Sequence, residues 1–155
     1  MTTELDLTLT RRVAASPATV YRCWTEPELL KQFFAPKPGR TVDAKLDVRP
    51  GGAFYTKMVF EEYGEIESEG CYLIVEPAKR LVFTDCLSAD FRPSAQPFFT
   101  ADLNFIETEE GCEYNVIARH ASAESVKRHE EMGFHEGWGT VARQMAEIAE
   151  AIERG

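Results

Sequence analysis

The stretch Phe134–Ile152, FHEGWGTVARQMAEIAEAI, decides the fold class of this 155-residue chain. Its large apolar residues recur at steps of four, three, four, three and four, and they are Phe134, Trp138, Val141, Met145, Ile148 and Ile152. Residues with this spacing form one stripe along an α-helix. We therefore expect a long amphipathic helix that buries one face against a second layer. Ser122 is a good N-cap residue, so the pattern predicts a single helix from there almost to the C-terminus.

The segment 40–119 supplies the second layer, because its pattern is that of β-strands throughout. Short apolar or alternating stretches are separated by turn sequences such as RPGG, EPAKR and TEEG, and by the proline-containing loop SADFRPSAQP. Strands joined by short turns favour an antiparallel meander. A curved sheet of this kind buries its concave face and the helical stripe at the same time.

The N-terminal part predicts one more strand and two short helices. Leu5, Leu7 and Leu9 alternate with polar residues, which is typical of a half-buried strand. The sequence SPATVY begins a helix with Ser16 as N-cap, and EPELLKQFF reads as a second short helix. The predicted fold is α+β: a curved antiparallel sheet of about six to seven strands, wrapped around a long C-terminal helix, with two short helices after the first strand.

Length and charge narrow the range of functions. A chain of 155 residues without repeats or linkers predicts a single domain spanning residues 1–155. The net charge is −9 and no cluster of Lys or Arg exists, so neither nucleic acid nor an anionic membrane surface is an expected partner. No apolar run approaches the roughly 20 residues of a membrane span, and no export signal is visible. The spacing of the four cysteines indicates neither a zinc site nor a disulfide framework, so we expect reduced thiols in a cytoplasmic protein.

Four stretches of the chain resemble one known family. They are TRRVAASPATVYRCWTEPELLKQFFAP (10–36), RPGGAFYTKM (49–58), EGCYLIVEPAKRLVFT (69–84) and MGFHEGWGTVARQMAEIAE (132–150). In order and spacing they resemble the family of activator of heat-shock protein 90 ATPase homologue-like proteins, within the START-like (SRPBCC) superfamily. The resemblance implies the helix-grip fold, also known from birch-pollen allergens, with a cavity for a small apolar ligand between sheet and helix. It implies neither a shared catalytic set nor a cofactor.

Strand alternation nominates the strand residues that would surround such a ligand, because every second side chain faces the same side of a sheet. Trp24 and Phe34 are expected to close one end of the cavity, and Phe134 and Trp138 to face them from the helix. The predicted ligand-binding residues are Trp24, Phe34, Phe54, Met58, Phe60, Phe83, Arg92, Phe99, Ala101, His120, Phe134 and Trp138. Most are apolar or aromatic, as in ligand pockets generally. Arg92 lies in the proline-containing loop, where it could meet an anionic head group at the mouth of the cavity.

Three polar residues fall among the inward positions and are the catalytic candidates that the sequence offers. His120 follows Val116 and Ala118 in register, and Asp85 follows Phe83. A titratable group inside an apolar cavity acquires a shifted pKa, which is one mark of a functional site. His120 with Asp85 or Tyr114 is the best acid–base pair that the sequence offers. No nucleophile motif accompanies them, so no catalytic set is assigned and the enzyme question stays open, leaning towards a binding protein.

The segment RHEEMGFHEGWGT (128–140) suggests a metal site at first sight. However, His129 and His135 are six residues apart, which places them about 120° from each other on a helix. His129 would also point about 140° away from Phe134, off the apolar stripe. A site that combines His120 with Glu130 or Glu131 is conceivable, but neither a metal nor a cofactor is predicted.

The same segment holds three glycines, each of which lowers helix stability by about 1 kcal/mol relative to alanine. Gly133, Gly137 and Gly139 would be explained most simply by a close approach of the helix to the sheet. Alternatively, they would keep the first helical turns mobile and so form a gate for a ligand.

Four functions remain open, and one of them is a domain with no ligand beyond self-association. We expect a protein that binds a small hydrophobic or amphipathic molecule between sheet and helix. The alternatives are a polyketide-cyclase-like enzyme that uses His120 with Asp85 or Tyr114, and a stress-linked co-chaperone-type interaction domain. A chaperone partner is suggested by the resemblance alone, and a homodimer is compatible with the sequence without being indicated by it.

Overall fold

The computed structural model describes residues 4–155. Its N-terminal part contains β1 (Asp6–Val13), α1 (Pro17–Thr25) and α2 (Pro27–Leu30). The strands that follow are β2 (Arg40–Leu46), β3 (Ala53–Phe60), β4 (Gly64–Glu76), β5 (Arg80–Thr84), β6 (Leu87–Ser88), β7 (Arg92–Pro93), β8 (Phe99–Thr108) and β9 (Gly111–His120). Two helices come last, and they are α3 (Ala123–Glu131) and α4 (Phe134–Arg154).

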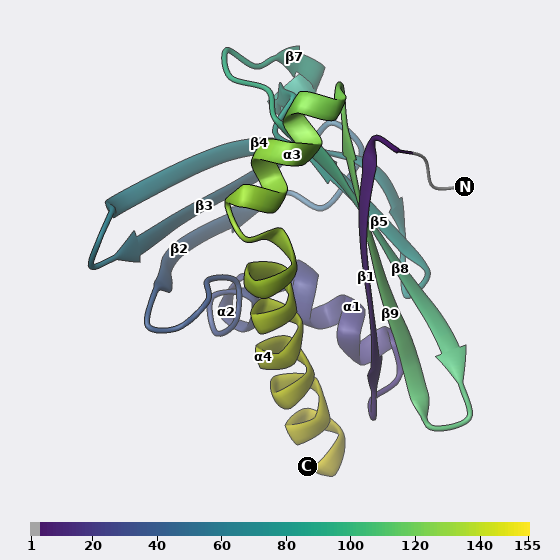
Figure 1. Cartoon of the computed structure of the whole chain (residues 1–155). Helices are drawn as coiled ribbons and strands as arrows, with labels where there is room; N and C mark the ends of the chain where they lie inside the picture. Colours follow the sequence, from purple (N-terminus) through teal and green to yellow (C-terminus); the bar gives the residue numbers. More distant parts are fainter. Residues whose placement is uncertain (1–3) are drawn as a thin grey trace.

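One antiparallel sheet of seven strands dominates the structure, in the order β1-β9-β8-β5-β4-β3-β2. The sheet curves around α4, which runs along its concave side, while α1 and α2 lie beside the helix at the same end of the sheet (Figure 1). This arrangement confirms the predicted α+β helix-grip fold. β6 and β7 form a separate two-stranded ribbon. Apart from Leu87, which was expected to end a strand, this ribbon lies in the segment 88–97 that was expected to be a loop.

The core forms where the concave face of the sheet meets α1 and α4. Trp24 of α1 is fully buried and stacks on Trp138 of α4, with ring centroids 6.2 Å apart. It also contacts Phe83 of β5 and Tyr114 of β9. A single aromatic side chain thus joins a short helix, the long helix and the sheet, which closes one end of the space between them.

The prediction of one continuous helix from residue 123 onwards is wrong. The helix is interrupted at Met132 and Gly133. Gly133 has φ +88°, a left-handed conformation that glycine adopts without a Cβ clash. Ser122 does cap α3, because its Oγ accepts a hydrogen bond from the backbone N–H of Ser125 at 3.2 Å. The break changes the direction of α3 relative to α4. The angle between two side chains on either side of it therefore differs from the angle expected for one straight helix.

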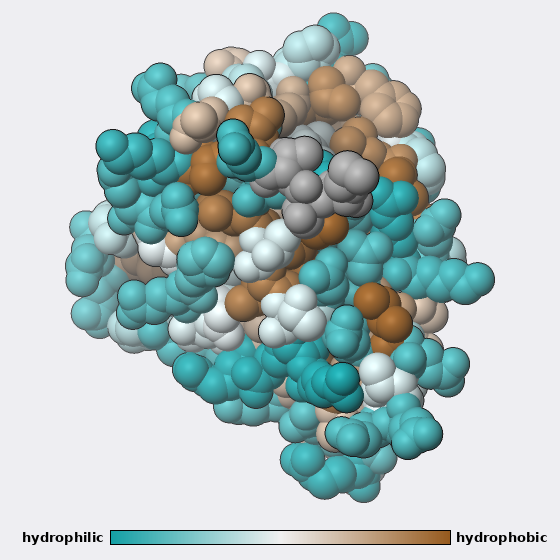
Figure 2. Space-filling view, turned by 45° about the vertical axis from the view of Figure 1, so that its right-hand side comes forward, coloured by the Kyte–Doolittle hydropathy of each residue, from teal (hydrophilic) through white to brown (hydrophobic). Residues whose placement is uncertain are grey.

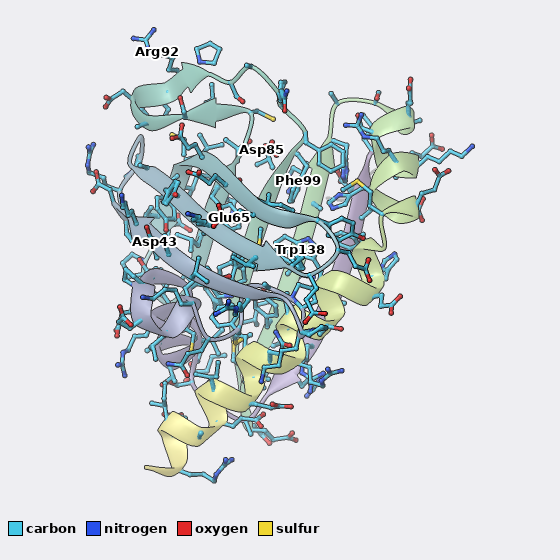
Figure 3. The ribbon with its side chains drawn as sticks, turned by 90° about the vertical axis from the view of Figure 1, so that its left-hand side faces the viewer. Asp43, Glu65, Asp85, Arg92, Phe99 and Trp138 are labelled. Carbon is cyan, nitrogen blue, oxygen red and sulfur yellow. The ribbon has the colours of Figure 1, made fainter. Side chains whose placement is uncertain are left out.

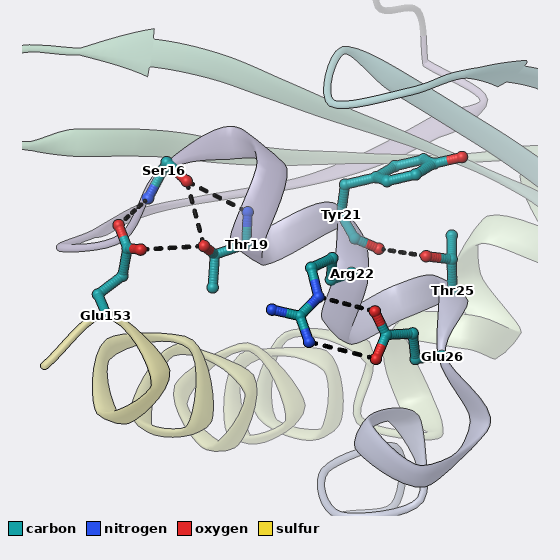
Figure 4. A network of polar contacts seen from close by, with 7 residues as sticks. All are labelled: Ser16, Thr19, Tyr21, Arg22, Thr25, Glu26 and Glu153. Carbon is teal, nitrogen blue, oxygen red and sulfur yellow. Dashed lines mark hydrogen bonds and ion pairs between the residues drawn. The ribbon is translucent and has the colours of Figure 1, made fainter. Parts of the chain in front are cut away.

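The C-terminal half of α4 is tied to the rest of the molecule by polar contacts. Glu153 accepts hydrogen bonds from the backbone N–H of Ser16 and the hydroxyl of Thr19, at 2.9 and 3.1 Å (Figure 4). Ser16 in turn caps α1 through the N–H of Thr19, as predicted. One turn earlier, Glu150 accepts a hydrogen bond from the backbone N–H of Ala14 at 2.9 Å.

Gln144 makes a second connection, nearer the middle of α4. Its amide nitrogen donates to the carbonyl oxygens of Phe33 and Ala35, and its amide oxygen accepts from the N–H of Lys37. The side chain is 5% exposed. A buried polar group with all three contacts satisfied holds the irregular segment after α2 against the helix.

Charged and polar groups cover much of the exterior. On the face shown in Figure 2, hydrophilic side chains dominate the lower part, while the most hydrophobic ones gather in the middle and upper parts. Within residues 4–155, no helix has the length and apolar character needed to cross a membrane.

Candidate ligand cavity

A cavity of about 340 Å³ lies between the concave face of the sheet and the N-terminal turns of α4. Its wall is largely apolar and aromatic. The lining residues are Phe34, Pro36, Phe54, Thr56, Met58, Phe60, Ser68, Gly70, Phe83, Thr84, Asp85, Phe99, His129, Met132, Gly133, Phe134, Gly137, Trp138 and Val141. Met132 is 68% exposed, so the cavity reaches the surface beside the break between α3 and α4.

Most of the aromatic residues expected around a ligand do line this cavity. Eight of the predicted positions do so, namely Phe34, Phe54, Met58, Phe60, Phe83, Phe99, Phe134 and Trp138. Phe54 and Phe83 form a stacked pair with ring centroids 4.4 Å apart, and Phe99 meets Trp138 edge to face at 6.0 Å. These rings come from three strands and one helix, so the wall exists only in the folded chain.

The other four predicted positions lie elsewhere. Trp24 and Ala101 are fully buried and do not line the cavity, although Trp24 packs behind the lining residues Phe83 and Trp138. Arg92 is exposed on β7, at the upper edge of the molecule in Figure 3, whereas Trp138 lies near the middle. It does not line the cavity, because the β6–β7 ribbon carries it outwards. His120 lies behind the wall, in contact with His129.

The structure does not bring the three catalytic candidates together. Asp85 lines the cavity next to Phe99 (Figure 3). Tyr114 is fully buried and stacks on Trp24, and burial raises the pKa of its hydroxyl far above the ordinary value. Tyr114 also lies six residues before His120 on β9, a separation of about 20 Å along an extended strand. An acid–base pair of His120 and Tyr114 is therefore excluded by geometry.

Asp85 is held by the backbone. Its Oδ1 accepts hydrogen bonds from the N–H groups of Phe98 and Phe99, at 2.8 and 3.0 Å. These contacts fix the carboxylate at the start of β8 and place its charge at the wall. Its other oxygen, Oδ2, has no hydrogen-bond partner within residues 4–155.

Several polar and small lining residues were missed by sequence reasoning. Thr56 is fully buried, and no partner for its Oγ1 exists in the described part of the chain. It pairs across the sheet with Ser68, while Phe54 pairs with Gly70. Strict alternation from Phe54 through Thr56 would have found the threonine, but following only apolar residues passed over it.

The expectation that the three glycines permit close packing on the sheet is wrong. A Cβ placed on Gly133, Gly137 or Gly139 would meet no atom within 4 Å. Gly133 and Gly137 line the cavity, whereas Gly139 does not. The absence of side chains at the first two positions therefore leaves space open.

The predicted direction of the His129 side chain, away from the core, is also wrong. It is 6% exposed, and its Nδ1 lies 2.8 Å from Nε2 of His120. The rings of Phe98, Phe99 and Phe134 surround it at centroid distances of 4.7–5.0 Å. The break at Gly133 causes the difference, since it separates the orientation of α3 from that of α4.

Burial among these rings lowers the pKa of His129 to about 4, from an ordinary value of 6.5. The neighbouring His120 and Arg128 contribute to the same lowering, because both disfavour a positive charge on His129. His129 is accordingly neutral near pH 7. A neutral imidazole carries one N–H donor and one nitrogen acceptor.

The metal hypotheses involve residues that the fold keeps apart. His135 is exposed on α4, and Glu130 and Glu131 are exposed on α3, while His120 and His129 are buried. Within residues 4–155, no cluster of three or more His, Cys, Asp or Glu side chains is arranged to hold a metal ion.

Comparison with known proteins agrees with this architecture. The family model described as Activator of Hsp90 ATPase homolog 1-like protein matches residues 14–150. The solved structure of protein NE0264 from Nitrosomonas europaea is 41% identical, with full coverage of both chains and a TM-score of 0.95. Protein Ms6760 from Mycobacterium smegmatis is 23% identical over 96% of this chain and 90% of its own, with a TM-score of 0.76.

A third solved structure is described as the AHSA1-like protein from Aeromonas hydrophila. It is 16% identical, covers 96% of this chain and 94% of its own, and has a TM-score of 0.71, so it supports the fold alone. None of the curated proteins matches the chain significantly.

The curved sheet, the long helix and the cavity between them define a helix-grip protein of the START-like class. The chain belongs to the family of Activator of Hsp90 ATPase homolog 1-like proteins, because the family model spans nearly all of it.

Proposed function

We propose that this protein binds a small, predominantly apolar molecule in the cavity between β3–β5 and the first turns of α4. The observation that carries the proposal is the cavity itself, about 340 Å³ in volume and walled by aromatic rings. Ligand pockets generally measure about 300–1,000 Å³ and combine apolar walls with a few polar groups. The volume lies near the lower end of this range, which suits a compact ligand.

The two halves of α4 differ in how they pack against the rest of the protein, and this difference supports the proposal. The C-terminal half is anchored through Gln144, Glu150 and Glu153. The N-terminal half carries Gly137 and adjoins Gly133, and open space faces both. A helix intended only to complete a solid core would be expected to place side chains there, since protein interiors are close-packed.

A matched pair of substitutions tests whether the cavity binds a ligand. Gly137 and Gly139 both lie in α4, and a Cβ at either position meets nothing within 4 Å. Only Gly137 lines the cavity. Leucine raises helix propensity at both positions, so Gly137→Leu and Gly139→Leu should both fold. The leucine at position 137 would occupy cavity volume, while the leucine at position 139 would not.

The measurement is fluorescence titration with N-phenyl-1-naphthylamine, an uncharged apolar probe. We expect the wild type and Gly139→Leu to bind it with similar affinity, and Gly137→Leu to bind at least about tenfold more weakly, since filling the site removes apolar contact area. Absence of binding to the wild type, or equal binding by both variants, would contradict the proposal. Native mass spectrometry of protein from its own host would then identify the natural ligand.

No specific structural observation favours either alternative function, the cyclase-like enzyme or the co-chaperone-type interaction domain. A cyclase reaction would need His120 with Asp85 or Tyr114, yet only Asp85 reaches the cavity wall. A chaperone partner is suggested by the family description alone.

A further inference from the structure

A chain of hydrogen bonds determines which nitrogen of His129 carries a proton. Nδ1 of His120 lies 3.0 Å from the carbonyl oxygen of Leu5, which can only accept, so this nitrogen carries the hydrogen. Nε2 of a neutral His120 is then an acceptor, and it lies 2.8 Å from Nδ1 of His129. His129 consequently donates through Nδ1, and its own Nε2 retains a lone pair.

The free lone pair of His129 is directed away from His120. The two nitrogens of an imidazole ring point to well-separated directions, and Nδ1 is the one that faces His120 behind the wall. His129 itself lines the cavity, and its Nε2 has no partner among residues 4–155. His129 as a whole is 6% exposed. Its Nε2 is therefore a hydrogen-bond acceptor, without a partner in the described chain, that is available to a molecule in the cavity.

The remaining polar groups of the wall show which ligands it disfavours. Asp85 contributes a carboxylate, and among the described residues that line the cavity none is lysine or arginine. An anionic head group would meet a like charge and no cation, which is costly in a site of low polarity. A ligand without a donor would leave Nε2 of His129 desolvated and unpaired.

We propose that the cavity selects an uncharged aromatic or polycyclic molecule carrying a hydroxyl group, an alcohol or a phenol, which donates its hydrogen bond to Nε2 of His129. This inference rests on the proposed function, because it specifies the ligand of the same cavity.

The test compares three probes of one size: 2-naphthol, 2-methoxynaphthalene and 2-naphthoate. Binding to the wild type is measured by calorimetry near pH 7, where the naphthol is uncharged and the naphthoate is an anion. We expect 2-naphthol to bind about tenfold more tightly than the ether, which is the effect of one satisfied hydrogen bond. The naphthoate should bind most weakly of the three.

Two variants assign the effects to separate residues. His129→Phe keeps a ring between Phe99 and Phe134 but removes the acceptor, so 2-naphthol should lose its advantage over the ether. Asp85→Asn keeps an oxygen for the N–H groups of Phe98 and Phe99 but removes the charge. It should improve naphthoate binding and leave the ratio of naphthol to ether within about twofold, since that ratio reports one neutral hydrogen bond.

The outcomes distinguish a failure of this inference about the ligand's hydroxyl group from a failure of the proposed binding function itself. Equal binding of 2-naphthol and the ether to the wild type would overturn the inference and leave a general apolar site. A naphthol preference that survives in His129→Phe would also overturn it, whether or not that variant is fully stable. If none of the three probes binds while N-phenyl-1-naphthylamine does, the inference fails alone. If that probe fails too, both proposals fail.

Discussion

His120 and His129 share a single hydrogen bond, 2.8 Å long, between Nε2 of the first and Nδ1 of the second. They belong to different elements, β9 and α3, and both are more than nine-tenths buried. This contact ties α3 to the edge of the sheet where β1 and β9 pair. It also brings one imidazole to the cavity wall and keeps the other behind it.

The first prediction concerns the pH dependence of stability. The pKa of His129 is about 4 in the folded protein and 6.5 ordinarily, because of burial and of the nearby His120 and Arg128. Its other neighbours, Phe98, Phe99 and Phe134, are uncharged. Between these two pH values the unfolded chain binds more protons than the folded one. The free energy of unfolding should therefore fall as the pH is lowered through this window, and stay constant above it.

The loss attributable to His129 should reach no more than about 3 kcal/mol. Urea unfolding at a series of pH values from about 7.5 to about 4.5 measures it. His129→Phe should flatten this part of the curve, whereas His135→Gln, at an exposed position, should not. An unchanged slope in His129→Phe would show that another group titrates.

The second prediction contrasts two glycines of the same segment. Gly133 has φ +88°, so Gly133→Ala should destabilise the protein by about 1–2 kcal/mol, the cost of a left-handed alanine. Gly137 is helical with open space around it, so Gly137→Ala should stabilise by up to about 1 kcal/mol. Chemical denaturation of both variants checks the opposite signs. Stabilisation by Gly133→Ala would mean that the helix is continuous in solution.

The third prediction concerns the polar anchor of α4. Gln144→Ala leaves two carbonyl oxygens and one N–H group without their partner, namely those of Phe33, Ala35 and Lys37. We expect a loss of at least about 2 kcal/mol in the free energy of unfolding. Glu147→Ala, on an exposed position of the same helix, serves as the control and should stay within about 0.5 kcal/mol of wild type. Equal effects would argue against the anchor.

The fourth prediction concerns Asp102, on the convex face of the sheet. It accepts two hydrogen bonds from Arg80 and one from Arg119, at 2.9–3.0 Å. Burial alone would raise the pKa of Asp102, but these hydrogen bonds outweigh it, and the pKa lies below its ordinary value of 3.8. Asp102→Asn should cost about 1–3 kcal/mol at neutral pH.

The same carboxylate sets a second pH window. A lowered folded pKa gives stability that is present above the unfolded pKa and lost as the pH falls through the folded one. The wild type should thus lose its advantage over Asp102→Asn only below about pH 4, which separates it from the His129 effect. Glu107→Gln, exposed on the same strand, is the control and should match the wild type throughout. A gap between wild type and Asp102→Asn that closes already near pH 6 would contradict this assignment.

Local patterns predicted the elements well because their causes are local. Ser16 and Ser122 both cap helices as expected, since a cap involves a hydroxyl and an N–H group only three residues apart. The inward faces of β3, β5 and β8 followed from the alternation of side chains, which any strand imposes. Five of the eight predicted residues that line the cavity follow from this alternation, namely Phe54, Met58, Phe60, Phe83 and Phe99.

The wrong predictions, of a continuous helix and of the direction of His129, arose where the same local sequence is compatible with two conformations. A glycine within a helical pattern either continues the helix or adopts a left-handed conformation, and the residues around Gly133 do not distinguish these cases. Placing one continuous helix there put His129 on the wrong side. The contact with His120 depends on how α3 packs against β9, which no spacing along the chain reveals.

The amino-acid sequence by itself determined the helix-grip arrangement of this protein, because the periods of 2 and 3.6 residues require a half-buried sheet and a one-sided helix to cover each other. Only the tertiary structure decided that a space remains between them. The volume of this space is what remains between the backbones of the sheet and the helix once side chains have filled most of it. These side chains, such as Phe54, Phe83 and Trp138, come from separate elements. The missing side chains of Gly133 and Gly137 add to that volume, and their effect depends on which way the broken helix turns.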